Sequence, residues 1–114
     1  MRGCFLLTGP PRHADLPTPA FLLGRVIADE AELLTLAVNP QSRRAGLARE
    51  LVQRFARQAA TLGAASAFLE VAADNLPAQT LYDTTGWRQT GRRRDYYAPG
   101  TDALILSLRL EAPG

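Results

Sequence analysis

The chain has 114 residues, a formal net charge of +2, 46% hydrophobic residues and 21% charged residues, values typical of one globular domain over residues 1–114 rather than of a disordered chain. A single cysteine, Cys4, and a single histidine, His13, exclude an intramolecular disulfide, a cysteine-rich zinc site and a multi-histidine metal centre. The small charge does not by itself indicate nucleic-acid binding, and no apolar run is long enough for a signal peptide or a membrane span, so we expect a cytoplasmic protein.

The first forty residues are expected to form strands. Residues 4–8 predict a short strand, and the prolines within residues 9–19 predict a loop. Residues 20–28 and 32–38 predict two further strands, joined as a hairpin by a short polar connection. Pro40 ends the second of these strands, since proline has no N–H to donate to a central ladder.

The clearest helical pattern lies in residues 44–62. Apolar side chains recur there at spacings of three and four, which predicts one buried stripe made of Leu47, Leu51, Phe55, Ala59 and Leu62. Gly63 follows at the position where a glycine commonly ends a helix.

A strand and a short helix are expected next. Residues 66–71 form a compact apolar run, typical of a buried strand in a parallel arrangement. Asp74 and Asn75 are then expected to supply the cap of a helix over residues 76–84. The inward face of this helix is expected to carry Ala78, Leu81 and Tyr82.

The last elements are two strands over residues 87–97 and 102–110, the second predicted from its alternating leucines. Trp87 is expected to lie in the core. The full order of strand, strand, strand, helix, strand, helix, strand, strand predicts an α/β fold with a mixed sheet.

The residues that open the long helix favour an anion-binding site. Arg43 and Arg44 add positive charge, and Gly46 lets the backbone approach a bound group. The first amides of a helix have no internal partners and point outward at the positive end of the helix dipole. The alternative is an ordinary left-handed turn with solvated arginines, and these residues alone do not separate the two interpretations.

Glu70 interrupts the apolar run of the strand over residues 66–71. An ionised carboxylate inside a buried strand is costly unless it is paired or used, which makes Glu70 a candidate general base. The alternative is that Glu70 lies at the carboxyl end of the strand and points into water. The carboxyl ends of strands are also where open α/β sheets bind ligands.

Three blocks of the sequence resemble, in order and at family spacing, the GNAT superfamily of acyl-CoA N-acyltransferases. The stretch LAVNPQSRRAGLARELV is similar to motif A of the family, with Arg43, Gly46 and Ala48 in its core. The stretch FLEVAADNLPAQTLYDTTGW resembles a second family pattern, and GRRRDYYAPGTDALILSL resembles the final strands of the RimI-type protein N-terminal acetyltransferases. The resemblance covers residues 32–110 and implies the GNAT fold, a mixed and mostly antiparallel sheet flanked by helices.

The resemblance implies acetyl-CoA as the co-substrate and no metal. The backbone of the strand before the loop would bind the pantetheine arm, the loop and first helical turn would bind the pyrophosphate, and an asparagine would add a contact. The residues at these positions are Leu36, Ala37 and Val38 for the arm, Arg43, Arg44, Ala45, Gly46, Leu47, Ala48 and Arg49 for the pyrophosphate, and Asn75 for the further contact.

The resemblance also implies catalytic roles. Glu70 matches the general base that accepts the proton of the acceptor amine, and Tyr82 matches the general acid that protonates the departing CoA thiolate. Tyr96 and Tyr97 match a pair that lies near the N-terminus of the acceptor peptide. From the residues alone, Tyr82 can also be a core aromatic, and the other two tyrosines can be a pair that simply packs on a strand.

The implied reaction is direct transfer of the acetyl group to the N-terminal α-amine of a protein, which in the best-known relatives is the alanine of a small-subunit ribosomal protein. We interpret Arg92, Arg93 and Arg94 as solvated strand residues rather than a nucleic-acid site. Two alternatives stay open: transfer to a small-molecule amine, and a truncated acyl-CoA binder without catalysis.

RimI-type enzymes carry some tens of residues, forming a strand and two helices, before the first strand expected here. The resemblance therefore implies a complete acetyl-CoA half and an N-terminally abbreviated acceptor half. The chain is then a minimal enzyme, completes its groove as a homodimer, or begins at a misassigned start. The missing helices would also expose apolar sheet surface, which favours self-association.

Overall fold

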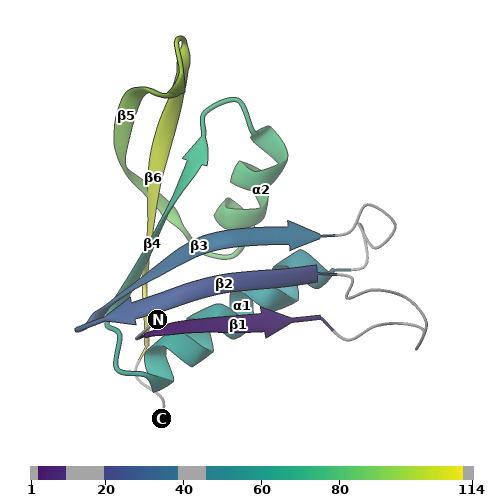
Figure 1. Ribbon diagram of the computed structural model, residues 1–114, viewed down its shortest axis with the longest axis vertical. Coiled ribbons are helices and arrows are strands. Elements are labelled where there is room, and N and C mark those ends of the chain that lie inside the picture. The colour runs from purple at the N-terminus through teal and green to yellow at the C-terminus, as the bar shows by residue number, and fades with distance from the viewer. Residues whose placement is uncertain (1–2, 10–19, 39–45, 112–114) are drawn as a thin grey trace.

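The computed structural model describes residues 3–9, 20–38 and 46–111, which form six strands and two helices (Figure 1). The elements are β1 Cys4–Thr8, β2 Ala20–Ile27, β3 Glu30–Val38, α1 Leu47–Thr61, β4 Ser66–Ala72, α2 Leu76–Thr84, β5 Arg88–Ala98 and β6 Thr101–Arg109. The predicted order is confirmed, although β3 begins two residues earlier than expected. Among the residues described, neither helix is long and apolar enough to cross a membrane.

All six strands belong to one sheet in the order β1-β2-β3-β4-β6-β5. Neighbouring strands pair antiparallel, except β3 and β4, which pair parallel. The predicted mixed and mostly antiparallel sheet flanked by helices is therefore confirmed. β5, which carries the consecutive arginines, is an edge strand of this sheet.

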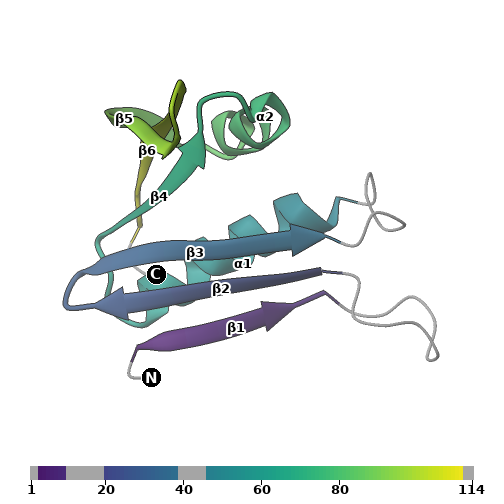
Figure 2. The same ribbon diagram turned by 45° about the horizontal axis from the view of Figure 1, so that its top comes forward.

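The two central strands, β3 and β4, pair over three residues and then diverge. Their pairs run from Glu30↔Ser66 to Glu32↔Phe68, and Figures 1 and 2 show the strands separating beyond that point. β4 instead follows β6, with which it pairs along its whole length. Within the described residues, the divergence leaves the second half of β3 with a strand on one side only.

Helix α2 is fastened to the end of β4, on the far side of this opening from β3. The Asn75 Oδ1 atom accepts a hydrogen bond of 3.2 Å from the Ala78 N–H, so Asn75 is the one of the two predicted residues that caps α2. Gln79 Nε2 donates to the carbonyl oxygens of Ala72 (3.2 Å) and Ala73 (3.0 Å) at the end of β4. These bonds tie the start of α2 to the end of β4.

Helix α1 packs its apolar stripe on one face of the sheet. Leu51, Phe55 and Ala59 are at most 1% exposed, as the sequence pattern predicts. The prediction is wrong for Leu62, which is 48% exposed because the helix ends at Thr61 and Leu62 already follows its last turn. The pattern also missed Val52, which is buried and widens the stripe.

A β-bulge at Leu34 changes which side chains of β3 face α1. The register of β2 against β3 shifts there by one residue, so Leu34 is the extra residue of β3. Before the bulge Leu33 lies in the core, and after it Leu36 and Val38 pack against the core instead. Simple alternation along the strand would have turned Leu36 and Val38 to the opposite face.

A row of aromatic rings connects the two helices. Phe5 stacks on Phe55 at 5.8 Å between centroids, Phe55 stacks on Trp87 at 6.3 Å, and Tyr82 meets the Trp87 ring edge-on at 5.8 Å. Trp87 is buried in the core, as expected. The row fixes the position of α2 relative to α1, and these helices form two walls of the site described below.

Apolar side chains are exposed on the face of β1, β2 and β3 that points away from α1. Leu6, Phe21 and Ile27 are 60%, 40% and 61% exposed. The prediction that apolar sheet surface is exposed is confirmed. Self-association through this face stays a prediction.

Gly24 of β2 lies under α1, where a side chain has no room. A Cβ added there would lie 2.7 Å from Cε1 of Phe55 and 3.0 Å from Cζ of Phe5. Phe55 is fully buried between two other rings, so it cannot move aside cheaply. We expect Gly24→Ala to lower the free energy of unfolding by about 1–3 kcal/mol, measured by urea denaturation.

The double variant Gly24→Ala/Phe55→Leu tests the cause of this loss. Leucine removes the Phe55 ring atoms, which lie closest to the new Cβ, so the alanine should cost about 1 kcal/mol less in the Phe55→Leu background than in the wild type. The same cost in both backgrounds would contradict the contact that we assign.

Candidate active site

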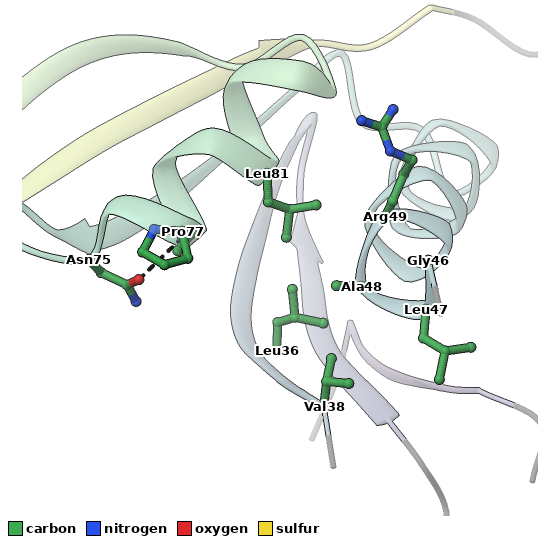
Figure 3. A pocket seen from close by; sticks show the side chains of 10 residues that line it. Leu36, Val38, Gly46, Leu47, Ala48, Arg49, Asn75, Pro77 and Leu81 are labelled. Carbon is green, nitrogen blue, oxygen red and sulfur yellow. Dashed lines mark hydrogen bonds between the residues drawn. The ribbon is translucent and has the colours of Figure 1, made fainter. Parts of the chain in front are cut away.

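A cavity of about 570 Å³ lies where the end of β3 and the beginnings of α1 and α2 face one another. Figure 3 shows Leu36 and Val38 of β3 and Leu81 of α2 across from the first turn of α1. The lining residues are Leu36, Val38, Gly46, Leu47, Ala48, Arg49, Asn75, Pro77, Ala78 and Leu81. The structure therefore gathers most of the described residues that were predicted to bind acetyl-CoA.

The N-terminus of α1 presents main-chain donors to this cavity. Gly46 is the N-cap residue, with φ 74° and ψ 10°, a left-handed conformation that glycine adopts without strain. Within the part of the chain that the structure describes, no side-chain hydrogen bond caps the helix at Gly46. The first amides, those of Leu47, Ala48 and Arg49, have no acceptor within the helix. An anion at this position would be stabilised by these donors and by the helix dipole.

The second half of β3 offers main-chain groups at the opening between the central strands. Along a strand, successive residues direct their N–H and C=O groups alternately to the two sides. Every second residue from Leu33 to Val38 therefore turns these groups away from β2. An extended ligand can bond to such an edge as an added strand would. Ala37 does not line the cavity with its side chain, so its predicted role depends on its main chain.

A second cavity, of about 400 Å³, adjoins the first and shares with it Leu36, Asn75, Ala78 and Leu81. Glu70 of β4, Tyr82 of α2 and Tyr97 of β5 all line this second cavity. Both predicted catalytic residues thus lie at one cavity, directly beside the site predicted for the coenzyme.

Glu70 is partly buried and paired. Its side chain is 19% exposed, and its Oε1 atom lies 3.4 Å from Nη2 of Arg93. Glu70 also lines a cavity of about 310 Å³ together with Arg93, Ile105 and Ser107. The Glu70 carboxylate is therefore neither fully solvated nor unpaired in a buried strand. Glu70 lines two of the cavities.

Tyr82 belongs both to the core and to the cavity. Its ring packs edge-on against Trp87, and the residue is 6% exposed. Burial raises the pKa of Tyr82 from 10.0 to about 12. The phenol therefore keeps its proton at neutral and mildly alkaline pH, where it acts as a hydrogen-bond donor.

Tyr96 and Tyr97 are half-exposed and meet edge to face, with 5.2 Å between ring centroids. Tyr97 lines the cavity of Glu70 and Tyr82, whereas Tyr96 does not. Burial and then the negative charge of Glu70 raise the pKa of Tyr97, as expected for a phenol near that carboxylate. Of the predicted acceptor pair, the structure brings only Tyr97 to the cavity.

Three predicted residues, Arg43, Arg44 and Ala45, lie outside the described residues, so their roles stay predictions. The sequence interpretation missed Arg93, which it treated as merely solvated. Arg93 is 54% exposed at its side chain, yet it pairs with Glu70. Only the register between β5, β6 and β4 reveals this pairing, and no short sequence pattern specifies that register.

The raised pKa of Tyr82 predicts an alkaline loss of stability. In the unfolded chain the phenol ionises near its ordinary value of 10.0, and in the folded chain only near 12. Its contribution to stability is therefore complete below pH 10 and is lost as the pH rises toward 12. Between these values the unfolding free energy of the wild type should fall by about 2–3 kcal/mol more than that of Tyr82→Phe. Equal slopes in denaturant titrations across this range would contradict the burial of an ionisable phenol.

Comparison with known proteins gives the same family from sequence and from structure. The acetyltransferase (GNAT) family matches residues 20–87. The [ribosomal protein bS18]-alanine N-acetyltransferases of Salmonella typhimurium and Escherichia coli are 37% and 39% identical over 98 and 93 residues. These matches cover 83% and 78% of this chain but 66% and 62% of the relatives. The chain therefore spans just under two thirds of the length of these curated relatives.

A solved structure agrees with the sequence relatives. The crystal structure of the ribosomal-protein-S18-alanine N-acetyltransferase from Escherichia coli has a TM-score of 0.79 and 33% identity to this chain. The match covers 90% of this chain and 68% of that protein. By its sequence, its divergent central strands and its similarity to these proteins, the chain belongs to the GNAT family of acetyltransferases.

Proposed function

We propose that the chain transfers the acetyl group of acetyl-CoA to the N-terminal α-amine of a protein. The observation that carries this proposal is the placement of Glu70 and Tyr82 at one cavity, which adjoins the cavity at the uncapped N-terminus of α1. A carboxylate and a protonated phenol beside an anion-binding helix end are the groups that amine acetylation from a thioester requires.

The coenzyme would occupy the 570 Å³ cavity. The amides of Leu47, Ala48 and Arg49 would bind its pyrophosphate, and Arg43 and Arg44 would add charge at the entrance. The open edge of β3 at Leu36, Ala37 and Val38 would bind its extended arm. This set fits the ligand because it supplies donors for the phosphates and an unpaired strand edge for the amide-containing arm.

Glu70 would act as the general base. An α-amine has a pKa of about 8, so at neutral pH it is mostly protonated and cannot attack a carbonyl carbon. The Glu70 carboxylate takes the proton, directly or through a water molecule, as the nitrogen forms its bond to the acetyl carbon. The position of Glu70 supports this role, because the cavity that it shares with Tyr82 and Tyr97 adjoins the proposed coenzyme cavity, so the amine and the thioester can meet beside the carboxylate.

Tyr82 would act on the departing sulfur. Its pKa of about 12 means that the phenol is fully protonated when the carbon–sulfur bond breaks. The hydroxyl donates a hydrogen bond to the sulfur as negative charge develops there. Because a thiol, with a pKa of about 8.5, is a stronger acid than this phenol, the hydrogen bond rather than complete proton transfer stabilises the thiolate. This reaction needs no nucleophilic cysteine, and Cys4 of the edge strand β1 lines none of the cavities described here.

The acceptor is proposed by similarity. The named function of the relatives is acetylation of the alanine of ribosomal protein bS18. We infer that a protein N-terminus of this kind, presented in the cytoplasm, is the acceptor here as well. The position of Tyr97 beside Glu70 supports an extended peptide over a compact small amine, because the tyrosine lengthens the wall of the cavity.

Substitutions of Asn75 can separate an effect on coenzyme binding from an effect on folding stability. Its Oδ1 atom caps α2, and its side chain also lines both cavities. Aspartate caps helices as well as asparagine does, but it replaces the amide donor by a negative charge. Asn75→Asp should therefore change the unfolding free energy by less than about 0.5 kcal/mol and weaken acetyl-CoA binding about tenfold by calorimetry.

The control for this variant is Asn75→Ala, which loses the cap and should be about 1 kcal/mol less stable than the wild type. If Asn75→Asp binds acetyl-CoA as tightly as the wild type, the cavity at α1 is not the coenzyme site.

Glu70→Gln tests the reaction itself. Glutamine keeps the size of the side chain but cannot accept the proton, so kcat/KM should fall by about 10²–10⁴-fold while acetyl-CoA binding is unchanged. The assay is mass spectrometry of short peptides with a free or a blocked N-terminus, together with small primary amines. Glu111→Gln, the same change at an exposed position after β6, is the matched control.

Acetylation of the free α-amine alone, abolished by Glu70→Gln, would support the proposal. Turnover of small amines without turnover of peptides would show that the acceptor is a small-molecule amine and not a protein N-terminus. Full activity of Glu70→Gln would remove Glu70 from the role of base.

A further inference from the structure

The hairpin of β5 and β6 contains an irregular segment at the candidate acceptor site. Its ladder has a first register shift between Gln89 and Gly91 and a second one between the pairs Arg93↔Ala103 and Ala98↔Thr101. Residues 94–97 therefore stand opposite the single residue Asp102, and we call these four residues the tyrosine bulge. Figure 1 shows this hairpin projecting beyond the end of β4.

Two carboxylates hold the tyrosine bulge at its base. Asp102 accepts one hydrogen bond at Oδ2 from Nε of Arg92 (2.6 Å) and another at Oδ1 from the main-chain N–H of Asp95 (2.9 Å). Asp95 in turn accepts a bond at Oδ1 from the N–H of Gly100 (2.6 Å). The side chain of Asp102 thus takes the place of the ladder bonds that the bulge interrupts.

Packing does little to fix the tyrosine bulge. Every residue from Arg92 to Ala98 is exposed, and Tyr96 and Tyr97 are each 50% exposed. Asp95 adopts a left-handed conformation with φ 51°, which a residue with a Cβ adopts only at some cost. A strained and exposed segment keeps one conformation only if specific bonds hold it, and here those bonds converge on Asp102.

The position of the tyrosine bulge matters to the candidate active site because Tyr97 shares a cavity with Glu70, and because Arg93, directly before the bulge, pairs with Glu70. Tyr97 lines the cavity of Glu70 and Tyr82, and Tyr96 packs edge-on against Tyr97. The guanidinium carbon of Arg93 lies 5.3 Å from the centre of the Tyr96 ring, and Nη2 of Arg93 lies 3.4 Å from Glu70. A chain of contacts therefore runs from Asp102 to the acceptor side of the carboxylate.

We propose that Asp102 is a positioning residue for the acceptor: it holds the tyrosine bulge so that Tyr97 and Arg93 face Glu70. Asp102 touches no reacting atom in this account and acts through Asp95 and Arg92. The inference rests on the proposed function, since it assigns Tyr97 and Arg93 to the side from which the acceptor amine enters.

The protonation state of Asp102 suits this role. The N–H of Asp95 and then the guanidinium of Arg92 hold the pKa of Asp102 below its ordinary value. The carboxylate therefore stays ionised at neutral pH, where charge-assisted hydrogen bonds are stronger than neutral ones.

Amide hydrogen exchange tests the structural half of the proposal without any substrate. In Asp102→Ala the Asp95 amide loses its acceptor, and the Gly100 amide is affected only if Asp95 also leaves its place. We expect both amides to exchange about tenfold faster or more, with the amides of β4 unchanged. Unchanged exchange at the Gly100 amide would contradict the claim that Asp102 holds the tyrosine bulge in place.

Acetyl-transfer kinetics test the functional half. For Asp102→Ala we expect the KM for a peptide acceptor to rise about tenfold, with kcat and the KM for acetyl-CoA within about twofold of the wild type. Asp102→Asn keeps an oxygen acceptor for the Asp95 N–H, so it should recover part of the loss and guards against misfolding of the alanine variant. Asp29→Ala, at an exposed aspartate in the turn between β2 and β3, is the matched control.

Each outcome decides a different point. A higher peptide KM in Asp102→Ala, partly rescued in Asp102→Asn, supports the proposal. Faster exchange with an unchanged peptide KM overturns it, because the bulge is then held by Asp102 without serving the acceptor. If the wild-type protein acetylates no peptide, both the proposed function and the positioning role are refuted. The exchange data then still show whether Asp102 holds the tyrosine bulge in place.

Discussion

The divergence of β3 from β4 is the constraint on which the rest of the structure depends. β4 pairs with β6 over its whole length but with β3 over three residues only, and α2 is bonded to the end of β4. The central strands must therefore separate, which opens the sheet between α1 and α2. An open strand edge follows from that separation, and two adjoining cavities lie at the opening, one of them at the N-terminus of α1. A sheet paired regularly across its centre would have no room for a coenzyme there.

The site combines rigid and lightly held parts. The proposed coenzyme side is built on the core, since Leu36 and Val38 pack against buried residues and the aromatic row ties α1 to α2. The proposed acceptor side depends on an exposed hairpin whose shape is set by polar contacts rather than by packing. Such a division suits an enzyme that holds one co-substrate in a fixed pose while another chain enters and leaves. It also means that substitutions on the two sides should affect different kinetic constants.

Much of this arrangement could be predicted from the sequence, for identifiable physical reasons. The stripe of α1, the cap at Asn75 and the alternation of β6 are local patterns, and local patterns determine elements well. The resemblance in three ordered blocks supplied Glu70, Tyr82 and the first turn of α1, which the structure brings together. The bulge at Leu34 and the pairing of Arg93 with Glu70 depend on strand register, which is set by contacts between residues far apart in the chain. Leu62 shows that a local pattern can also mislead, because its spacing fits the stripe of α1 but the helix ends before it.

The most direct test of this account is a titration of the ¹⁵N-labelled protein with acetyl-CoA, followed by the amide signals in an NMR spectrum. We expect the largest shifts at the open edge of β3 from Leu36 to Val38, at the first turn of α1 and at the start of α2. These amides surround the opening made by the divergent strands. Largest shifts on the exposed face of β1 and β2, or no shifts at saturating acetyl-CoA, would contradict the claim that the divergence of β3 and β4 creates the coenzyme site.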